Sequence, residues 1–296
     1  MTVPFETIIR RHCRPLEPIR TQSVPELATL SGIQAVLFDV YGTLLMSASG
    51  DVGTASASDR GNAFVEALKA VGFAIPIEGR HGAELLTETI RAHQAQARSN
   101  GVEFPEVDII RVWQDALSQL CEDEPQVDSS PATDLRQLSL EFECRVNPVW
   151  PMPHVNECLR ELRDRSLTLG IVSNAQFFTP ELFKPLMGTD LDKLGFDPRL
   201  CFYSYRFGQA KPGDFLYEQA SNELATRGIA AGQVVYVGND MLNDIWPAAR
   251  AGFRTALFAG DARSLRLRDG DERVSAVTPD LVLTDLGQLP SCIANE

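Results

Sequence analysis

Three short, mostly apolar runs, each followed by a polar residue or glycine, dominate the hydrophobic pattern of the chain. Runs of this length are typical of strands that are buried on both faces, as in a parallel sheet. The runs are 35–38 before Asp39, 167–172 before Ser173, and 234–237 before Gly238. The pattern therefore predicts three central strands whose carboxyl ends carry these three residues.

Helical and weaker strand patterns alternate along the second half of the chain. Helical spacing follows the second and third runs at 180–187 and 242–251, and weaker strand patterns occur at 200–204, 255–259 and 281–283. This alternation is typical of a doubly wound, Rossmann-like α/β fold with a parallel sheet. Such sheets bind ligands beyond the carboxyl ends of their strands, so we expect Asp39, Ser173 and Gly238 to meet at one crevice.

The stretch 59–146 follows a different pattern. Apolar residues recur there at intervals of three and four, which indicates amphipathic helices, and no strand pattern interrupts them. The four groups are Phe64, Leu68 and Val71; Leu86, Ile90, His93 and Ala97; Ile110, Trp113, Leu117 and Leu120; and Leu135, Leu138 and Phe142. The spacing predicts an all-helical insert of about four helices.

Two connections of distinct composition flank this insert. The first, 47–54, consists of small residues, and prolines in the second, 147–153, disfavour helix and central strand. A mobile lid over a crevice requires two such connections, and a fixed helical subdomain fits them equally well. We therefore divide the chain into an N-terminal extension (1–30), an α/β core (31–50 and 148–296) and a helical cap domain (51–147).

Composition narrows the class of partner. The chain has 40 acidic and 27 basic residues and a net charge of −13, which argues against a nonspecific nucleic-acid binder. No apolar run approaches the roughly 20 residues that cross a bilayer, and the charged N-terminus lacks the apolar segment of a secretory signal. Six cysteines without a Cys-x-x-Cys pair are typical of reduced thiols. We expect a cytoplasmic protein that acts on a small anionic substrate, and no feature indicates an oligomeric state.

The segment 38–44, Phe-Asp-Val-Tyr-Gly-Thr-Leu, places a carboxylate at the end of the first predicted strand. An ionised Asp39 there must be paired, hydrogen-bonded or bound to a metal, because burying an isolated charge is costly. Two roles fit this position. Asp39 is either a nucleophile that forms an acyl-type intermediate, as in aspartyl-phosphate enzymes, or a cap for the turn that follows.

Other polar residues near the predicted strand ends suit an anionic substrate. Ser173 and Asn174 can donate hydrogen bonds to an anionic oxygen. Lys211 brings a positive charge that can neutralise an acidic nucleophile and the reacting anion together. Asp240 and Asp244 supply carboxylates for a hard cation, and Mg²⁺ needs only one or two of these because it keeps several waters.

Four motifs in order resemble those of the haloacid dehalogenase (HAD) superfamily. The segment 39–43 resembles the nucleophile motif Asp-x-[Asp/Tyr]-Gly-Thr, and 171–174 resembles the second motif, a strand that ends in Ser or Thr. Lys211 with Pro212 resembles the third motif, and the loop 237–244 resembles the acidic fourth. The resemblance covers the chain outside the first thirty residues and the insert, which is itself similar to the family's helical C1-type cap.

The resemblance implies a hydrolase that forms a covalent aspartyl intermediate on Asp39 and uses Mg²⁺. The catalytic residues that it implies are Asp39, Tyr41, Ser173 and Lys211, and the substrate-binding residues are Thr43, Ser173, Asn174 and Lys211. The metal site that it implies consists of Asp39, the backbone carbonyl of Tyr41, Asp240 and Asp244.

Two positions depart from the family's phosphatase pattern. Phosphatases of the superfamily have a second Asp two residues after the nucleophile, which protonates the leaving oxygen. This residue is Tyr41 here, and a tyrosine with its ordinary pKa of about 10 is a poor substitute. The 2-haloacid dehalogenase branch has tyrosine at this place. The fourth motif usually begins Gly-Asp, so either Asn239 is the metal ligand and Asp244 the distal acid, or Asp240 and Asp244 act as a pair.

Three functions are compatible with these residues. The first is a Mg²⁺-dependent phosphatase on a small phosphorylated metabolite, which Lys211, Ser173 and the acidic loop favour and Tyr41 opposes. The second is a metal-independent 2-haloacid dehalogenase or a related carbon-centred hydrolase, which Tyr41 and Asn174 favour. The third is a non-catalytic binding protein that kept the fold. We expect the first.

Overall fold

The computed structural model describes residues 3–49, 57–73, 79–123 and 134–294, and it confirms the predicted α/β class. Six strands form one sheet in the order β5-β4-β1-β6-β7-β8, and each neighbouring pair is parallel. The strands are β1 (Ala35–Phe38), β4 (Thr168–Ser173), β5 (Phe196–Tyr203), β6 (Val234–Gly238), β7 (Arg254–Phe258) and β8 (Leu281–Leu283). The three runs predicted as central strands are neighbours within it.

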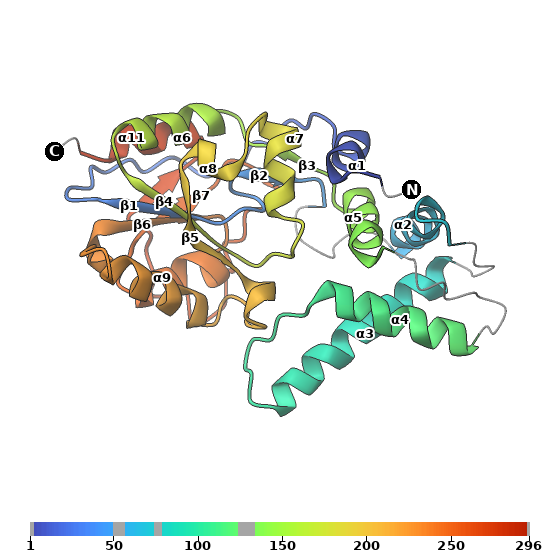
Figure 1. Cartoon of the computed structure of the whole chain (residues 1–296). Helices are drawn as coiled ribbons and strands as arrows, with labels where there is room; N and C mark the ends of the chain where they lie inside the picture. Colours follow the sequence, from blue (N-terminus) through green and yellow to red (C-terminus); the bar gives the residue numbers. More distant parts are fainter. Residues whose placement is uncertain (1–2, 50–56, 74–78, 124–133, 295–296) are drawn as a thin grey trace.

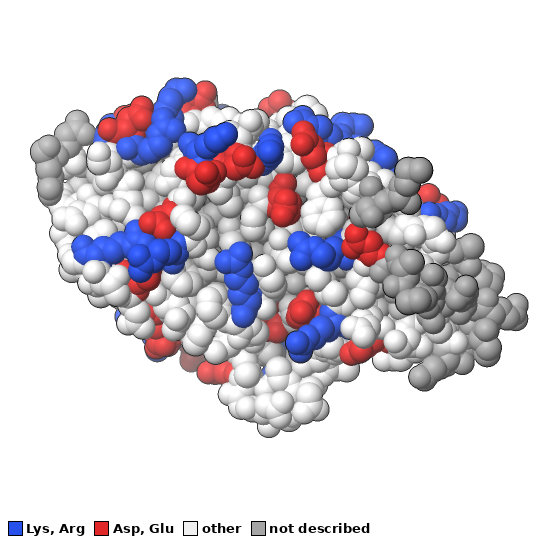
Figure 2. Space-filling model, in the orientation of Figure 1, with Lys and Arg blue, Asp and Glu red and all other residues white. Residues whose placement is uncertain are grey.

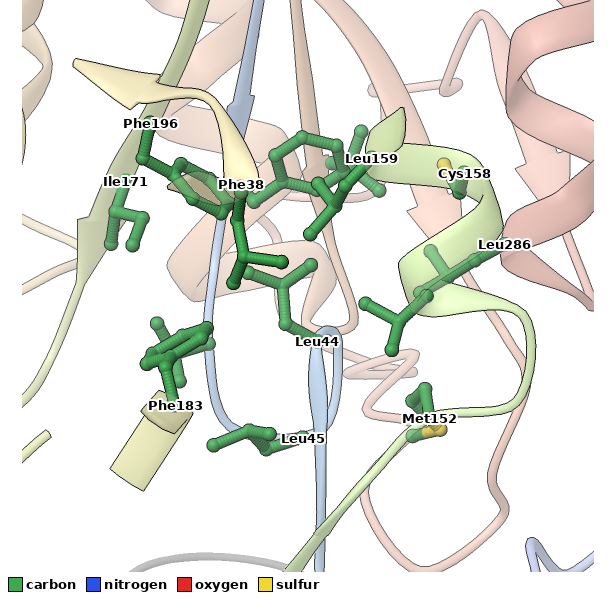
Figure 3. Packing of buried hydrophobic residues seen from close by; sticks show 14 of the residues in the cluster. Phe38, Leu44, Leu45, Met152, Cys158, Leu159, Ile171, Phe183, Phe196 and Leu286 are labelled. Atoms are coloured by element: carbon green, nitrogen blue, oxygen red, sulfur yellow. The ribbon is translucent and has the colours of Figure 1, made fainter. Parts of the chain in front are cut away.

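Helices cover both faces of this sheet (Figure 1). Alternate residues of β1 point to opposite faces, since Val36 and Phe38 belong to one hydrophobic cluster and Ala35 and Leu37 to another. Figure 3 shows the first cluster around Phe38, whose ring meets Phe196 edge-on with centroids 6.2 Å apart. The first cluster includes residues of α6 (Val155–Asp164), α7 (Phe183–Met187), α8 (Leu191–Leu194) and α11 (Leu289–Cys292), and the second includes residues of α9 (Phe215–Ala225) and α10 (Trp246–Arg250).

The strand register brings the polar residues that follow the strands together at the carboxyl ends of β1, β4 and β6. Phe38 pairs with Ile171 of β4 and with Val237 of β6, so Asp39 lies beside the ends of both neighbouring strands. A 3₁₀ helix (Pro180–Leu182) continues into α7 and a π-helix (Met241–Ile245) into α10, as the helical spacing predicts. Further 3₁₀ helices are Ser204–Arg206, Ala231–Gln233 and Leu286–Gln288.

A small antiparallel ribbon, which the sequence did not predict, joins the two connections to the helical insert. It pairs β2 (Leu45–Ser47) with β3 (Val149–Pro151). The hydroxyls of Ser47 and Ser49 both donate to Asn147 Oδ1, at 2.6 and 2.8 Å. The prolines of the second connection are tolerated because this ribbon has two strands and is not part of the central sheet. Residues 50–54 of the first connection lie outside the described residues.

Between β2 and β3 the described chain is helical, as predicted. It forms α2 (Ala57–Ala70), α3 (Gly79–Ser99), α4 (Ile109–Asp123) and α5 (Leu135–Val146). These helices pack around a cluster of their own, in which Trp113 stacks on Phe64 and meets Phe142 edge-on. Helix α5 also belongs to the core, because Leu140 and Cys144 join the cluster around Phe38. Figure 1 shows α3 and α4 at the end of the molecule away from α6 and α11.

The N-terminal extension begins with a helix, α1 (Phe5–His12), that the sequence pattern did not predict. It lies against α5 (Figure 1), where His12 Nε2 is 3.2 Å from Oε2 of the buried Glu141. Farther along, Glu26 forms an antiparallel bridge to Val282 of β8. The extension is therefore packed on α5 of the insert and on the α/β core.

The surface carries charges of both signs. Figure 2 shows Lys and Arg side chains interspersed with Asp and Glu over one face of the molecule. Within the described ranges, no helix combines the length and the apolar composition that crossing a membrane requires.

Candidate active site

A cavity of about 290 Å³ lies beyond the carboxyl ends of β1, β4 and β6. Its walls come from the core and from the helical insert. The lining residues are Asp39, Tyr41, Gln94, Pro105, Glu106, Asn174, Ala210, Lys211, Asn239, Asp240, Asn243, Asp244, Ser264 and Arg266. Six of the eight residues predicted for the site are among them. The other two, Thr43 and Ser173, are fully buried behind the wall.

Lys211 stands between two carboxylates at the centre of this wall. Its Nζ donates to Asp39 Oδ1 at 2.7 Å and to Asp244 Oδ1 at 2.6 Å. It also donates to the hydroxyl of Tyr236 at 3.1 Å, and that hydroxyl donates in turn to the carbonyl of Val172 at 2.8 Å. All three charged side chains are at least nine-tenths buried, so this is a buried ion cluster at the cavity wall.

The cluster holds two carboxylates and one ammonium group, and burial together with these charges shifts the pKa values of Lys211 and Asp244. Burial acts to lower the pKa of Lys211, but Asp244 and Asp39 outweigh it and raise this pKa, so the ammonium stays charged. Burial raises the pKa of Asp244 to about 7, with Lys211 opposing and the negative charges of Asp39 and Asp240 adding to the rise.

Asn174 fixes the backbone of Lys211 from the end of β4. Its Oδ1 accepts from Lys211 N at 2.7 Å, and its Nδ2 donates to Lys211 O at 3.1 Å. Ser173 Oγ makes a long hydrogen bond of 3.4 Å to the carbonyl of Asn174. Asn174 thus positions the lysine, and hydrogen bonds from Ser173 and Asn174 to the substrate stay a prediction.

Three loops meet tightly at Gly42. This glycine has φ 82°, and a Cβ there would lie 2.6 Å from Ser264 Cβ and 2.7 Å from Asn239 Nδ2. The loops are tied together, because Thr43 Oγ1 donates to Asn239 Oδ1 at 3.1 Å and Asn239 Nδ2 donates to Ser264 O at 2.6 Å. A side chain at this position would displace the loop that carries Asp39.

The Gly42→Ala protein is therefore expected to be destabilised and to lose activity. Left-handed backbone strain alone costs about 1–2 kcal/mol in any non-glycine residue. Gly72→Ala is the matched control, since Gly72 has φ 87° and open space around its Cβ direction. Urea unfolding should show a larger loss for Gly42→Ala than for Gly72→Ala. Equal losses would mean that the close approach of Ser264 and Asn239 does not matter.

The two aspartates of the acidic loop, Asp240 and Asp244, bind different partners. Asp244 faces Lys211, and its Oδ2 accepts from Asp240 N at 2.9 Å. The carboxylate of Asp240 faces Arg268 instead, with Arg268 Nη2 2.5 Å from its Oδ2 and Arg268 Nε 3.0 Å from its Oδ1. Asp240 also caps the following turn by accepting from Leu242 N at 2.9 Å.

Tyr41 does not offer a proton to the cavity. Its hydroxyl lies 2.9 Å from Thr179 Oγ1, at the start of the helical turn that follows β4. Burial raises the pKa of this phenol well above 10, with the negative charge of Glu143 adding to the rise. A neutral tyrosine held in this way is not a substitute for a carboxylic acid.

Several lining residues were not predicted from the sequence. Ser264 and Arg266 come from the connection between β7 and β8, and Gln94 and Glu106 come from the helical insert. None of them lies next to a motif. Tyr236 is different, because a hydroxyl in the apolar run of β6 is a signal that sequence reasoning passed over.

A second cavity of about 430 Å³ lies beside the first, between the insert and the core, and Gln94 and Glu106 line both. Most of its other lining side chains are apolar, with Leu86, Ile90, Trp113, Phe142 and Phe178 among them. The lining contains one acidic residue besides Glu106, which is Glu143. Burial raises the pKa of Glu143 to about 7 against the opposing effects of Asn147 and Arg60.

This raised pKa predicts that Glu143→Gln stabilises the protein above neutral pH. The ordinary pKa of the group is 4.5, so between pH 4.5 and about 7 the unfolded chain binds fewer protons than the folded one. Stability is therefore lost across this window as pH rises. At pH 8 the free energy of unfolding of the variant should be about 1–3 kcal/mol larger than that of the wild type. Urea unfolding at pH 5 and pH 8 measures the difference.

The exposed Glu88→Gln change is the control for removing one negative charge from the insert. A gain for Glu143→Gln that is equally large at both pH values would contradict the explanation.

Comparison with known proteins places this site in a family. The family model of the haloacid dehalogenase-like hydrolases matches residues 33–252. A 2-haloacid dehalogenase from Pseudomonas syringae pv. tomato DC3000 superposes with a TM-score of 0.57 at 22% identity, covering 88% of this chain and 97% of that one. A HAD phosphatase from Thermococcus onnurineus has a TM-score of 0.50 at 17% identity, with the same coverage of both chains.

Among the curated proteins, none is similar enough in sequence to match. The structural similarities support the fold alone, since both identities are low. The family match extends from the strand before Asp39 to the helix after the acidic loop. The chain therefore belongs to the haloacid dehalogenase-like hydrolases.

Proposed function

We propose that this hydrolase is a Mg²⁺-dependent phosphatase that acts on a small phosphorylated metabolite in the cytoplasm. The observation that carries the proposal is the polar wall of the cavity around Lys211. Of the fourteen lining residues, only Pro105 and Ala210 have purely aliphatic side chains. A phosphoryl group, with its charged oxygens, suits such a wall better than the carbon and halogen atoms of a haloacid do.

In the proposed reaction Asp39 attacks phosphorus. Its Oδ1 is bound to Lys211, and within the described part of the chain Oδ2 has no hydrogen-bond partner, which leaves that oxygen for the substrate. The ammonium of Lys211 offsets the charge that develops as nucleophile and phosphate approach. Asn174 holds the backbone of Lys211 in place, and Asp244 accepts a hydrogen bond from its ammonium.

The oxygen donors near Asp39 fit a Mg²⁺ ion. We propose Asp39, the backbone carbonyl of Tyr41 and the amide oxygen of Asn239 as its ligands. Asp240, one of the two residues considered from the sequence, is ion-paired with Arg268. The amide oxygen of Asn239 accepts one neutral hydrogen bond, from Thr43, and keeps a second lone pair, which favours Asn239. Over the described ranges, no three His, Cys, Asp or Glu side chains form a metal cluster, so waters would complete the shell. The ion would supply positive charge for the phosphoryl oxygens.

A second candidate is a metal-independent 2-haloacid dehalogenase. Tyr41 favours it, because this tyrosine is bound to Thr179 and a halide leaves without a proton. One of the similar solved structures is also described as a 2-haloacid dehalogenase.

The two candidates differ in product and in metal dependence. Purified protein is assayed with a panel of small phosphate monoesters and of 2-halo acids, each with Mg²⁺ and with EDTA. We expect phosphate release that EDTA abolishes and Mg²⁺ restores. Halide release in EDTA, with no phosphate release under any condition, would establish the second candidate instead.

A further inference from the structure

The helical insert places a carboxyl group in the wall of the active-site cavity. Glu106 belongs to the connection between α3 and α4. This connection approaches the core at the loop that carries Lys211. Figure 1 shows this connection as the segment that joins the lower end of α3 to α4. It brings an acid to the cavity from outside the four motifs.

Backbone hydrogen bonds hold this connection on the core. Ala210 N donates to Phe104 O at 2.8 Å, and Glu106 N donates to Gly208 O at 3.1 Å. Both core residues lie in the segment that leads directly into Lys211. The position of Glu106 is therefore fixed relative to the lysine that binds Asp39.

The carboxyl group of Glu106 is held by neutral donors. Its Oε2 accepts from Ser204 Oγ at 2.7 Å, and its Oε1 accepts from Val107 N at 2.9 Å and from Gln176 Nε2 at 3.3 Å. Burial raises its pKa, although the hydrogen bonds from Ser204 and Val107 oppose the rise. This group therefore keeps its proton to a higher pH than an ordinary glutamate.

Over the residues that the structure describes, Glu106 differs from the other acids of the cavity in having no cation beside it. Four acidic residues line it; two of them share Lys211, and Asp240 ion-pairs with Arg268. Among the described residues, the side-chain partners of Glu106 are all neutral. A carboxyl group without a neighbouring cation is the one that most readily holds a proton. Asp244 also has a raised pKa, but it is bound to Lys211, which leaves Glu106 as the acid of the cavity best suited to donating a proton.

We infer that Glu106 is the acid that protonates the leaving oxygen, the role that Tyr41 cannot fill. This inference rests on the proposed phosphatase function. Asp39 forms a bond to phosphorus while the bond from phosphorus to the leaving oxygen breaks. The leaving oxygen keeps that electron pair and takes the proton of Glu106. Glu106, now a carboxylate, takes a proton back from the water that hydrolyses the aspartyl phosphate.

The test uses two phosphate monoesters of similar size and different leaving groups. The 4-nitrophenolate of 4-nitrophenyl phosphate leaves without protonation, whereas the alkoxide of 4-nitrobenzyl phosphate needs a proton. Glu106→Gln keeps an oxygen that accepts from Ser204 and removes the acid. We expect kcat/KM to fall about 10²–10⁴-fold for the benzyl ester and less than about tenfold for the phenyl ester.

Ser204→Ala is the matched control, because it weakens the attachment of the connection and leaves the acid in place. It should lower the turnover of both esters by the same factor. The double variant Glu106→Gln/Tyr41→Asp, which restores an acid at the family's usual place, should regain turnover of the benzyl ester.

An equal fall for both esters in Glu106→Gln, or no fall, would overturn the inference and leave the phosphatase function standing. Wild-type protein that hydrolyses the phenyl ester but not the benzyl ester would also overturn it. Wild-type protein that hydrolyses no phosphate monoester at all would refute the proposed function itself.

Discussion

The Asp39→Asn protein is expected to stay folded and to lose turnover by a factor on the order of 10⁴–10⁶, the effect of removing a covalent nucleophile. An amide nitrogen or oxygen at this place does not form the aspartyl intermediate. The fold should persist because Lys211 keeps its 2.6 Å contact with Asp244. Steady-state phosphate release and circular dichroism measure the two halves of this prediction.

Stability provides a sharper check on the same variant. Asp39 and Asp244 are like charges that share one ammonium group, so removing the charge of Asp39 relieves their repulsion. We expect the free energy of unfolding of Asp39→Asn to be about equal to that of the wild type, or slightly larger. Asp192→Asn, at an exposed aspartate, is the control. An Asp39→Asn protein that is folded and keeps more than about a tenth of the activity would exclude Asp39 as the nucleophile.

The central strands could be predicted because burial on both faces restricts their side chains to apolar ones. β1, β4 and β6 are covered on both faces, and this burial requires the apolar runs that the sequence displays. β5 was predicted only over its second half. It lies at the edge of the sheet, and its first half contains Asp197 and the exposed Arg199, which interrupt the apolar pattern.

The candidate site likewise contains residues that the sequence predicted and contacts that it could not predict. Asp39 ends β1, Asp244 lies in the π-helix after β6 and Lys211 lies in the loop after β5, so the parallel sheet brings the segments that carry them to the same end. The pairing of Asp240 with Arg268 depends on how the connection between β7 and β8 folds back over the acidic loop. No local pattern encodes such a contact between segments that are distant in sequence.

The same limit applies to Glu106 and to the N-terminal helix. Glu106 is an ordinary charged residue in the connection between two helices until the segment 104–106 pairs with 208–210. α1 is a short helix that packs against α5, and two turns of helix carry little pattern of their own. Residues that complete the cavity from the insert are therefore visible only after the insert is placed on the core.

Lys211→Met is expected to lower both stability and turnover, because it leaves two buried carboxylates without a cation. Breaking a buried ion pair on one side costs about 3–5 kcal/mol, and loss of one electrostatic stabiliser lowers the rate on the order of 10²–10³-fold. The stability loss should shrink as pH falls, since the stranded carboxylates then take up protons. Urea unfolding at pH 5 and pH 8 and steady-state phosphate release measure these effects.

Two variants separate the charge effect from the loss of a side chain. Lys69→Met removes a lysine whose side chain is 63% exposed and, among the described residues, paired with Glu66 alone, so it should change stability by less than about 1 kcal/mol. The double variant Lys211→Met/Asp244→Asn removes the cation and one carboxylate together. It should recover much of the stability and none of the activity, because Asp39 still lacks its ammonium partner. A double variant that is as unstable as Lys211→Met would show that packing, and not the balance of charge around Asp39, holds this end of the sheet together.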